Sequence, residues 1–79
     1  MPATKKFTAK FYALATLGAA TSEIAPYYTS EQRAMQAAFE AKGTGTCSTV
    51  RVYECDSVAI ARTVDIGEVR RGERVIATV

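Results

Sequence analysis

The sequence predicts a small α+β domain, in which one helix packs across one face of a mostly antiparallel sheet of three to four strands, in the order β-α-β-β-β. Three observations predict this fold. Residues 29–42 carry the signals of a helix, residues 49–62 resemble a strand pair about a tight turn, and residues 74–79 alternate once more. Because the chain has only 79 residues, we expect a single domain over residues 1–79.

Residues 7–16 are compatible with two structures. In a strand, alternate residues line one face: Phe7, Ala9, Phe11, Ala13 and Ala15. In a helix, a different set shares a stripe: Phe7, Phe11, Leu14 and Gly18. We prefer the strand, because the aromatic alternation is cleaner than the helical stripe and only Thr4 could cap a helix. A short second strand around residues 22–25 could follow it.

The helix is predicted from its two ends. Thr29 and Gln32 have the spacing of a capping box, in which each side chain accepts or donates at the other's backbone. Gly43 lies where a helix would end, since glycine is common just beyond the last helical turn. These signals predict a helix over residues 29–42.

One face of this helix is predicted to be buried. Met35, Ala38 and Phe39 recur at i, i+3 and i+4, which is the spacing of an apolar stripe. Smaller alanines widen the stripe: Ala34, Ala37 and Ala41. If Phe39 is a core residue, its replacement by alanine should cost roughly 3–5 kcal/mol of stability.

A strand pair is predicted next. Residues 49–54 alternate, and a turn at residues 55–57 would lead into a returning strand over residues 58–62. This turn places Val52 opposite Ile60, a better apolar pair than the one-residue shift that opposes Val52 and Ala59.

A last strand over residues 74–79 would then place Val75, Ala77 and Val79 on one face.

The two cysteines are predicted to be free thiols. Cys47 and Cys55 lie eight positions apart, and in one strand they would be separated by roughly 26 Å at ~3.3 Å per residue. A disulfide needs Cα atoms within about 7 Å. Reduced cysteines are typical of an intracellular protein.

Residue types argue against catalysis and metal binding. The chain has no histidine, so it lacks the usual general base near neutral pH and any Ser-His-Asp or Cys-His arrangement. Two cysteines without histidine do not complete a zinc site in one chain. We therefore expect no enzyme activity, no catalytic or metal-ligating residues, and no cofactor.

Basic residues form the best candidate for anion or nucleic-acid contact. Four arginines cluster near the last turn: Arg62, Arg70, Arg71 and Arg74. Three lysines near the N-terminus could join them: Lys5, Lys6 and Lys10. Acidic residues reduce the charge, because three of them lie among the arginines and the whole chain carries only +2. Tyr12 and Tyr53 could offer stacking faces to bases.

An uncovered sheet face is the best candidate for an interface. A single helix covers one face, and the other face is predicted to carry Tyr12, Tyr53, Ala59 and Ala61. Small alanines beside tyrosines suit a flat contact, and a chain this short gains from further burial. A short edge strand that ends at Val79 could also pair with its own copy across a two-fold axis. We therefore expect a homodimer through either contact.

Two functional hypotheses follow. The first is a non-enzymatic interaction or binding module that self-associates, or that binds another protein or a small molecule. The alternative is a small nucleic-acid-binding domain that uses the basic turn and the lysine-rich N-terminus.

The N-terminal region carries the sequence signals for the location of the protein in the cell. Two lysines followed by the apolar residues 11–20 loosely resemble a signal peptide, but Thr16 interrupts the run and Lys10 adjoins it. The run is also shorter than the about 20 residues that span a bilayer. We expect a cytoplasmic protein without membrane contact.

Overall fold

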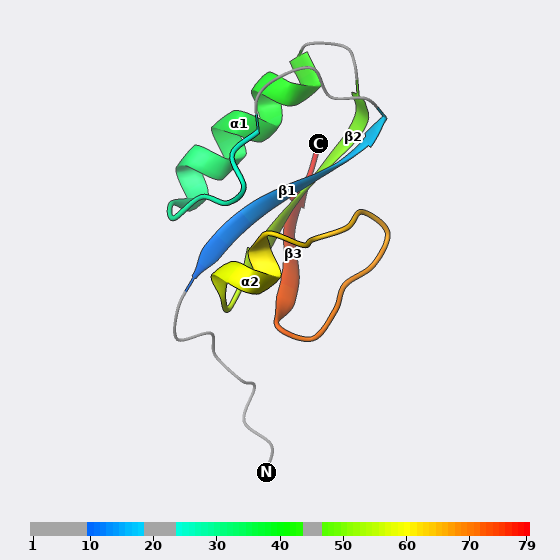
Figure 1. Ribbon diagram of the computed structural model, residues 1–79. Coiled ribbons are helices and arrows are strands. Elements are labelled where there is room, and N and C mark those ends of the chain that lie inside the picture. The colour runs from blue at the N-terminus through cyan, green and yellow to red at the C-terminus, as the bar shows by residue number, and fades with distance from the viewer. Residues whose placement is uncertain (1–9, 19–23, 44–46) are drawn as a thin grey trace.

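A three-stranded antiparallel sheet separates two unequal layers (Figure 1). The computed structural model describes residues 10–18, 24–43 and 47–79. In chain order the elements are β1 (Phe11–Gly18), α1 (Glu31–Gly43), β2 (Cys47–Cys55), α2 (Val58–Ala61) and β3 (Glu73–Thr78). The predicted α+β class is confirmed, with the element order β-α-β-α-β.

Strand β2 is the centre of the sheet, with β1 and β3 on either side. Val52 lies opposite Leu14 of β1 and Ala77 of β3. Because both faces of the sheet are covered along β2, the largest fully buried side chains of the described residues all lie on this strand: Val50, Val52, Tyr53 and Cys55.

The preference for a strand in the first segment is confirmed over residues 11–16, while residues 7–9 lie outside the described part. The tentative strand at residues 22–25 is wrong for residues 24 and 25, and residues 22 and 23 lie outside the described part. Instead, Tyr28 exchanges two backbone hydrogen bonds with Tyr12 on the outer side of β1, with N···O distances of 2.8 and 2.7 Å.

Helix α1 is confirmed, but its capping differs. The backbone N–H of Arg33 donates to the Ser30 hydroxyl at 3.4 Å, and Ala34 donates to the Ser30 carbonyl at 3.0 Å. The prediction of a capping box at Thr29 and Gln32 is therefore wrong. Since Tyr28 is held against β1, the chain enters the helix one residue later than the box requires.

The buried face of α1 consists of three alanines, Ala34, Ala38 and Ala41. The prediction that Phe39 is a core residue is wrong, because its side chain is 59 % exposed. Each helical residue turns about 100°, so Phe39 points well away from Ala38. The alanines let the helix approach the sheet closely, which leaves no room beneath it for a phenyl ring.

The predicted strand at residues 58–62 is wrong. Residues 58–61 form the single turn α2, and the Ser57 hydroxyl accepts a hydrogen bond from the Ile60 N–H at 3.2 Å. Serine is a preferred N-cap, and the alternating alanines in this segment do not resist a helical turn. The place beside β2 is taken by β3, so Val52 pairs with Ala77 rather than with Ile60.

Two apolar clusters lie on opposite faces of the sheet. The cluster beneath α1 is made of Tyr12, Ala34, Ala38, Ala41, Cys47, Val50 and Val52. The second cluster lies beneath α2 and the following loop and is made of Ala13, Ala15, Tyr53, Cys55 and Ala61.

Strand β3 contributes to both clusters, because the register shifts between Val52 and Tyr53. Val75 packs on the α2 side, whereas Ile76, Ala77 and Val79 pack on the α1 side. The last strand is thus confirmed, but the prediction that Val75 shares a face with Ala77 and Val79 is wrong. No helix in the described ranges is long and apolar enough to cross a membrane.

Candidate functional site

The open sheet face expected from the sequence does not exist within one chain. Tyr12 is buried on the α1 side, and Tyr53 is buried on the α2 side. Ala61 is buried with Tyr53, and only Ala59 is exposed. The face that seemed uncovered is occupied by α2 and residues 62–72, because the segment predicted to extend the sheet folds over it instead.

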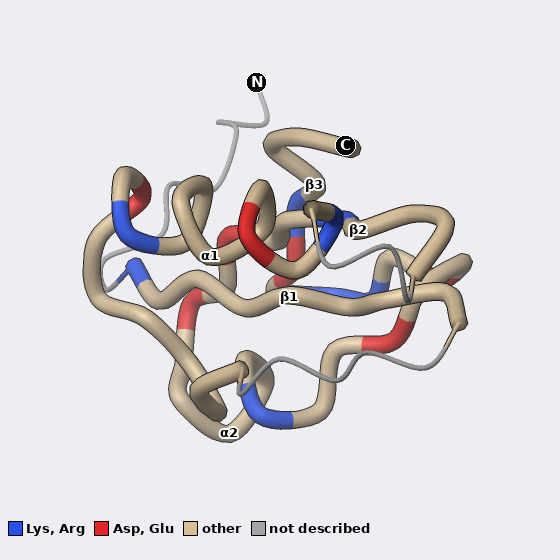
Figure 2. Tube along the Cα trace, turned by 90° about the horizontal axis from the view of Figure 1, so that it is seen from above, with Lys and Arg blue, Asp and Glu red and all other residues tan. Residues whose placement is uncertain are grey.

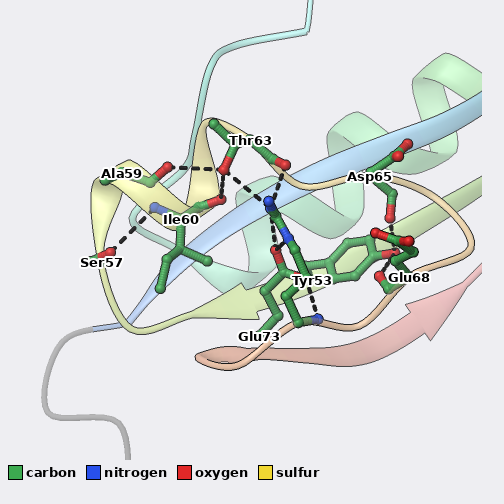
Figure 3. Close-up of polar contacts among 9 residues, drawn as sticks. Tyr53, Ser57, Ala59, Ile60, Thr63, Asp65, Glu68 and Glu73 are labelled. Carbon is green, nitrogen blue, oxygen red and sulfur yellow. Dashed lines mark hydrogen bonds and ion pairs between the residues drawn. The ribbon is translucent and has the colours of Figure 1, made fainter.

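Residues 62–72 form a loop that is anchored to the sheet by Tyr53 (Figure 3). The Tyr53 hydroxyl lies 2.6 Å from the carbonyl oxygen of Asp65 and 3.0 Å from that of Glu68. Side chains of Val64 and Ile66 pack against the cluster below. The loop is therefore a fixed layer of the fold.

A buried carboxylate closes the base of this loop. Glu73 accepts hydrogen bonds from the Arg70 backbone N–H at 2.9 Å and from its guanidinium at 3.0 and 2.6 Å. The same guanidinium also donates to Thr63 at the other end of the loop (Figure 3). Arg70 therefore has a structural role, as part of an internal ion pair.

A second buried carboxylate holds two further cations. Glu54 is only 3 % exposed and accepts hydrogen bonds from Arg74 and from the Tyr12 hydroxyl, the latter at 3.4 Å. The Lys10 Nζ lies 3.7 Å from the same carboxylate. Burial, together with the Glu54 charge, raises the pKa of Tyr12.

The predicted basic cluster is thus only partly available to phosphates. Arg70, Arg74 and Lys10 are ion-paired, whereas Arg62 and Arg71 are exposed. Figure 2 shows basic and acidic residues interspersed along the trace. Lys5 and Lys6 lie outside the described residues.

The prediction of two free thiols is confirmed. Cys47 and Cys55 lie at opposite ends of β2, and both are buried. Cys47 donates to the Ala41 carbonyl at 3.1 Å. Burial, reinforced by the nearby Glu73 carboxylate, raises the pKa of Cys55 to about 12, which favours the protonated thiol near neutral pH.

One hollow opens on the outer flank of α1. It encloses about 160 Å³ and is lined by Tyr28, Arg33, Gln36, Ala37 and Glu40. Small-molecule sites usually enclose about 300–1,000 Å³, so this hollow is too small for most of them. Across the described part of the chain, no three potential metal ligands cluster.

Strand β3 offers a different kind of site, an open sheet edge. It pairs with β2 on one side, and no described strand pairs with it on the other. Residues 75–79 carry no charge and no proline. Edge strands usually carry such residues to prevent pairing with another chain, and here the main protection is the register shift at Ile76, which interrupts the regular edge.

An apolar flank of α1 borders this edge. Arg33 and Ala37 lie on the flank of α1 that meets Tyr28, on the outer side of β1. Met35 and Phe39 are on the other flank of the helix, which is the flank toward β3. Met35 packs against the same cluster as Ile76 and Val79. Helix α1 packs over β2 and β1, which leaves the α1 side of β3 less covered.

We call the free side of β3 together with Met35, Phe39, Ile76 and Val79 the β3 edge surface. The sequence predicted β3 and the apolar character of Phe39, but it assigned Phe39 to the core. The signal that could have corrected it is the run of three alanines at i, i+4 and i+7, which matches a buried stripe without Phe39.

Comparison with known proteins adds no relative to this picture. No protein-family model matches the chain, and neither the curated proteins nor the solved structures include a match.

Proposed function

We propose that the chain is a non-enzymatic interaction module that binds an extended polypeptide strand along the β3 edge surface. The observation that carries this proposal is the outer edge of residues 75–78, which carry no charge and with which no described strand pairs, together with Phe39, which is 59 % exposed on the flank of α1 that carries Met35. Unpaired backbone N–H and C=O groups provide the affinity in strand addition, and neighbouring apolar side chains add selectivity.

The opposite edge of the sheet supports the choice of β3. At β1, Tyr28 already occupies the outer side of the strand at Tyr12 through two backbone hydrogen bonds. A strand added there would meet this segment within its first residues. The β3 edge has no comparable obstruction among the described residues.

The proposal is tested by adding a strand. A synthetic peptide with the sequence of residues 73–79 is titrated into the isotope-labelled full chain, followed by NMR. We expect shifts concentrated at the amides of β3 and at the Phe39 ring. The control peptide is N-methylated at alternate residues, so it presents the same side chains but cannot pair along an edge. Equal binding of the two peptides, or shifts confined to other surfaces, would contradict the proposal.

Two exposed apolar residues provide matched variants. Phe39 is 59 % exposed on the flank of α1 that carries Met35, and Val69 is 57 % exposed in the loop on the other face. Phe39→Ser should weaken peptide binding, whereas Val69→Ser should leave it unchanged. If both changes act equally, general surface hydrophobicity explains the binding.

We also propose a cytoplasmic location. It is supported by two buried cysteines that remain thiols, which suits a reducing compartment. Fractionation of cells that produce the tagged full chain tests this directly, and recovery in the secreted or membrane fraction would contradict it.

A further inference from the structure

We infer that the strand bound along β3 carries an acidic side chain, which pairs with Arg51 across Thr78 on the α2 side of the sheet. This inference rests on the proposed function, because it starts from strand addition at β3 and names the chemistry of the occupant. It also gives Arg51 a binding role that the sequence did not indicate.

Arg51 is a half-buried cation without a partner. Its Nε is shielded from solvent and donates to no atom of the described residues. The ion pairs within the described ranges use Lys10, Arg70 and Arg74, and none involves Arg51. A buried polar group without a hydrogen bond costs stability, so native structures rarely leave one unpaired. A ligand carboxylate would offset this cost, and Arg51 would give up no ion pair with a described residue to reach it.

The sheet places Arg51 on the side that faces α2. Val50 and Val52 pack beneath α1, so Arg51, which lies between them on β2, projects from the opposite face. Thr78 lies directly opposite Arg51 in the β2–β3 ladder and is exposed. Residues that lie opposite each other in a ladder share a face, so Thr78 is on the α2 side as well. In this row of the sheet, Thr78 alone separates Arg51 from the outer edge of β3.

The backbone at Thr78 is oriented for strand addition. Val79 exchanges two backbone hydrogen bonds with Val50, with N···O distances of 2.8 and 3.0 Å, so the polar groups of Val79 point toward β2. Hydrogen-bonded and non-hydrogen-bonded pairs alternate along an antiparallel ladder, so the N–H and C=O of Thr78 point away from β2. The register shift lies at Ile76, before this stretch. An added strand can therefore form a hydrogen-bonded pair at Thr78.

The residue added beside Thr78 comes within reach of Arg51. Two strand spacings separate the two backbones, about 10 Å at ~4.8 Å each. Arginine has a long side chain, and its planar guanidinium binds a carboxylate through two parallel hydrogen bonds. A glutamate in the added strand, on the same face as Thr78, can therefore meet the guanidinium over the short threonine side chain.

The neighbouring loop favours a ligand with a single negative charge. The carbonyl oxygens of Asp65 and Glu68 lie within hydrogen-bonding distance of the Tyr53 hydroxyl, and Tyr53 follows Arg51 on the same face of β2 (Figure 3). Both acidic side chains are exposed. Their charges oppose a dianionic phosphate more strongly than a carboxylate. We therefore expect an acidic rather than a phosphorylated side chain.

Matched peptides test the inference by NMR titration of the isotope-labelled full chain. Each is a capped heptapeptide that alternates valine and threonine, with one threonine replaced by glutamate or by glutamine. Replacement at the second residue places the new side chain beside Thr78 in an antiparallel pair, and replacement at the sixth residue does so in a parallel pair.

In one of the two placements, the glutamate peptide should bind about tenfold more tightly than its glutamine counterpart, because hydrogen bonds between charged groups are the stronger ones. Equal affinities in both placements would overturn the inference. A phosphoserine peptide that binds more than about tenfold more tightly than the glutamate peptide would overturn the choice of a carboxylate.

Two arginine variants locate the effect. Arg51→Met removes the charge and keeps an apolar stem, so it should abolish the preference for glutamate while leaving affinity for the glutamine peptide within about twofold. Arg62→Met is the control, because Arg62 is exposed and forms no ion pair with a described residue. It should keep the full preference. Circular dichroism confirms that each variant is folded. A folded Arg51→Met chain that still prefers glutamate would overturn the role of Arg51.

The outcomes separate this inference from the proposed function. Equal binding of the glutamate and glutamine peptides, with shifts at the β3 amides, would overturn the acidic partner and leave strand addition intact. If none of the peptides shifts the β3 amides, both proposals are contradicted.

Discussion

The substitution Phe39→Ala tests whether this side chain lies outside the core of the chain. Phe39 is 59 % exposed, so about 80 Å² of a ~200 Å² side chain is covered in the isolated chain. At ~25 cal/mol per Å² this is about 2 kcal/mol, of which the retained Cβ keeps a part. Alanine also favours the helix by about 0.5 kcal/mol. We therefore expect a loss of about 1 kcal/mol at low protein concentration, well below the roughly 3–5 kcal/mol of a core phenylalanine.

Urea unfolding at low protein concentration measures this loss. The variant should lose about 1 kcal/mol relative to the natural chain. A loss near 4 kcal/mol would refute this reasoning, since it would place the ring in the core.

Tyr53→Phe removes the hydroxyl that anchors the 62–72 loop, and calorimetry should show a loss of about 1 kcal/mol, with a melting temperature lower by roughly 4–8 °C; an unchanged melting temperature would refute the anchor. Gly72→Ala should destabilise more than Gly67→Ala, because both glycines have positive φ (88° and 96°) but only the Gly72 Cβ would meet neighbouring atoms, the nearest at 2.6 Å; equal losses in denaturant would contradict the steric part. Because folding raises the pKa of Cys55 from 9.0 to about 12, stability should be fully retained below pH 9 and fall as the pH rises toward 12, and thiol reagents should react only in denaturant. Affinity for a short single-stranded oligonucleotide should be weak with a shallow salt slope, because two of the four clustered arginines pair with buried carboxylates; a steep slope would support the nucleic-acid alternative.

Local signals predicted most of the secondary structure. The first strand, the helix near residues 29–42, the strand around residues 49–54 and the last strand were all expected from periodicity. In each of these segments, the structure that the local residue pattern favours is also the one that its contacts in the folded chain require. Apart from the start of the first strand, the boundaries moved by one or two residues, which is the usual behaviour of caps and fraying ends.

The failures arose where tertiary contacts decide between local alternatives. The alternating residues 58–62 satisfy a strand pattern, but the space beside β2 goes to β3, which comes later in the sequence. Once β3 occupies it, Ser57 caps a single helical turn instead. Likewise, Phe39 and the alanines both fit apolar stripes, and only the distance between helix and sheet selects the alanines.

Of the two contacts predicted from the sequence, the edge of the last strand remains a candidate, whereas the open sheet face does not exist. An uncovered apolar surface was expected from the shortness of the chain, yet the residues assigned to it, including Tyr12 and Tyr53, lie in the two clusters. Burial of each tyrosine depends on partners far along the chain, which spacing does not reveal. Two of the arginines were misjudged for the same reason. Arg70 and Arg74 pair with the buried carboxylates of Glu73 and Glu54, whereas the sequence shows these glutamates only as negative charges.

The alanine face of α1 connects the fold to the proposed interface. Small side chains bring the helix close to β2, where Ala34 and Ala38 contact the cluster that includes Val50 and Val52. A helix that lies so close covers a narrow strip of sheet, and β3 falls outside it. A leucine in place of Ala38 would hold α1 farther from the sheet. The alanine lets α1 lie close to the sheet, and the flank of α1 that carries Phe39 then faces outward. The same small residues that make the core dense therefore leave this edge less covered, which is where the proposed strand would be added.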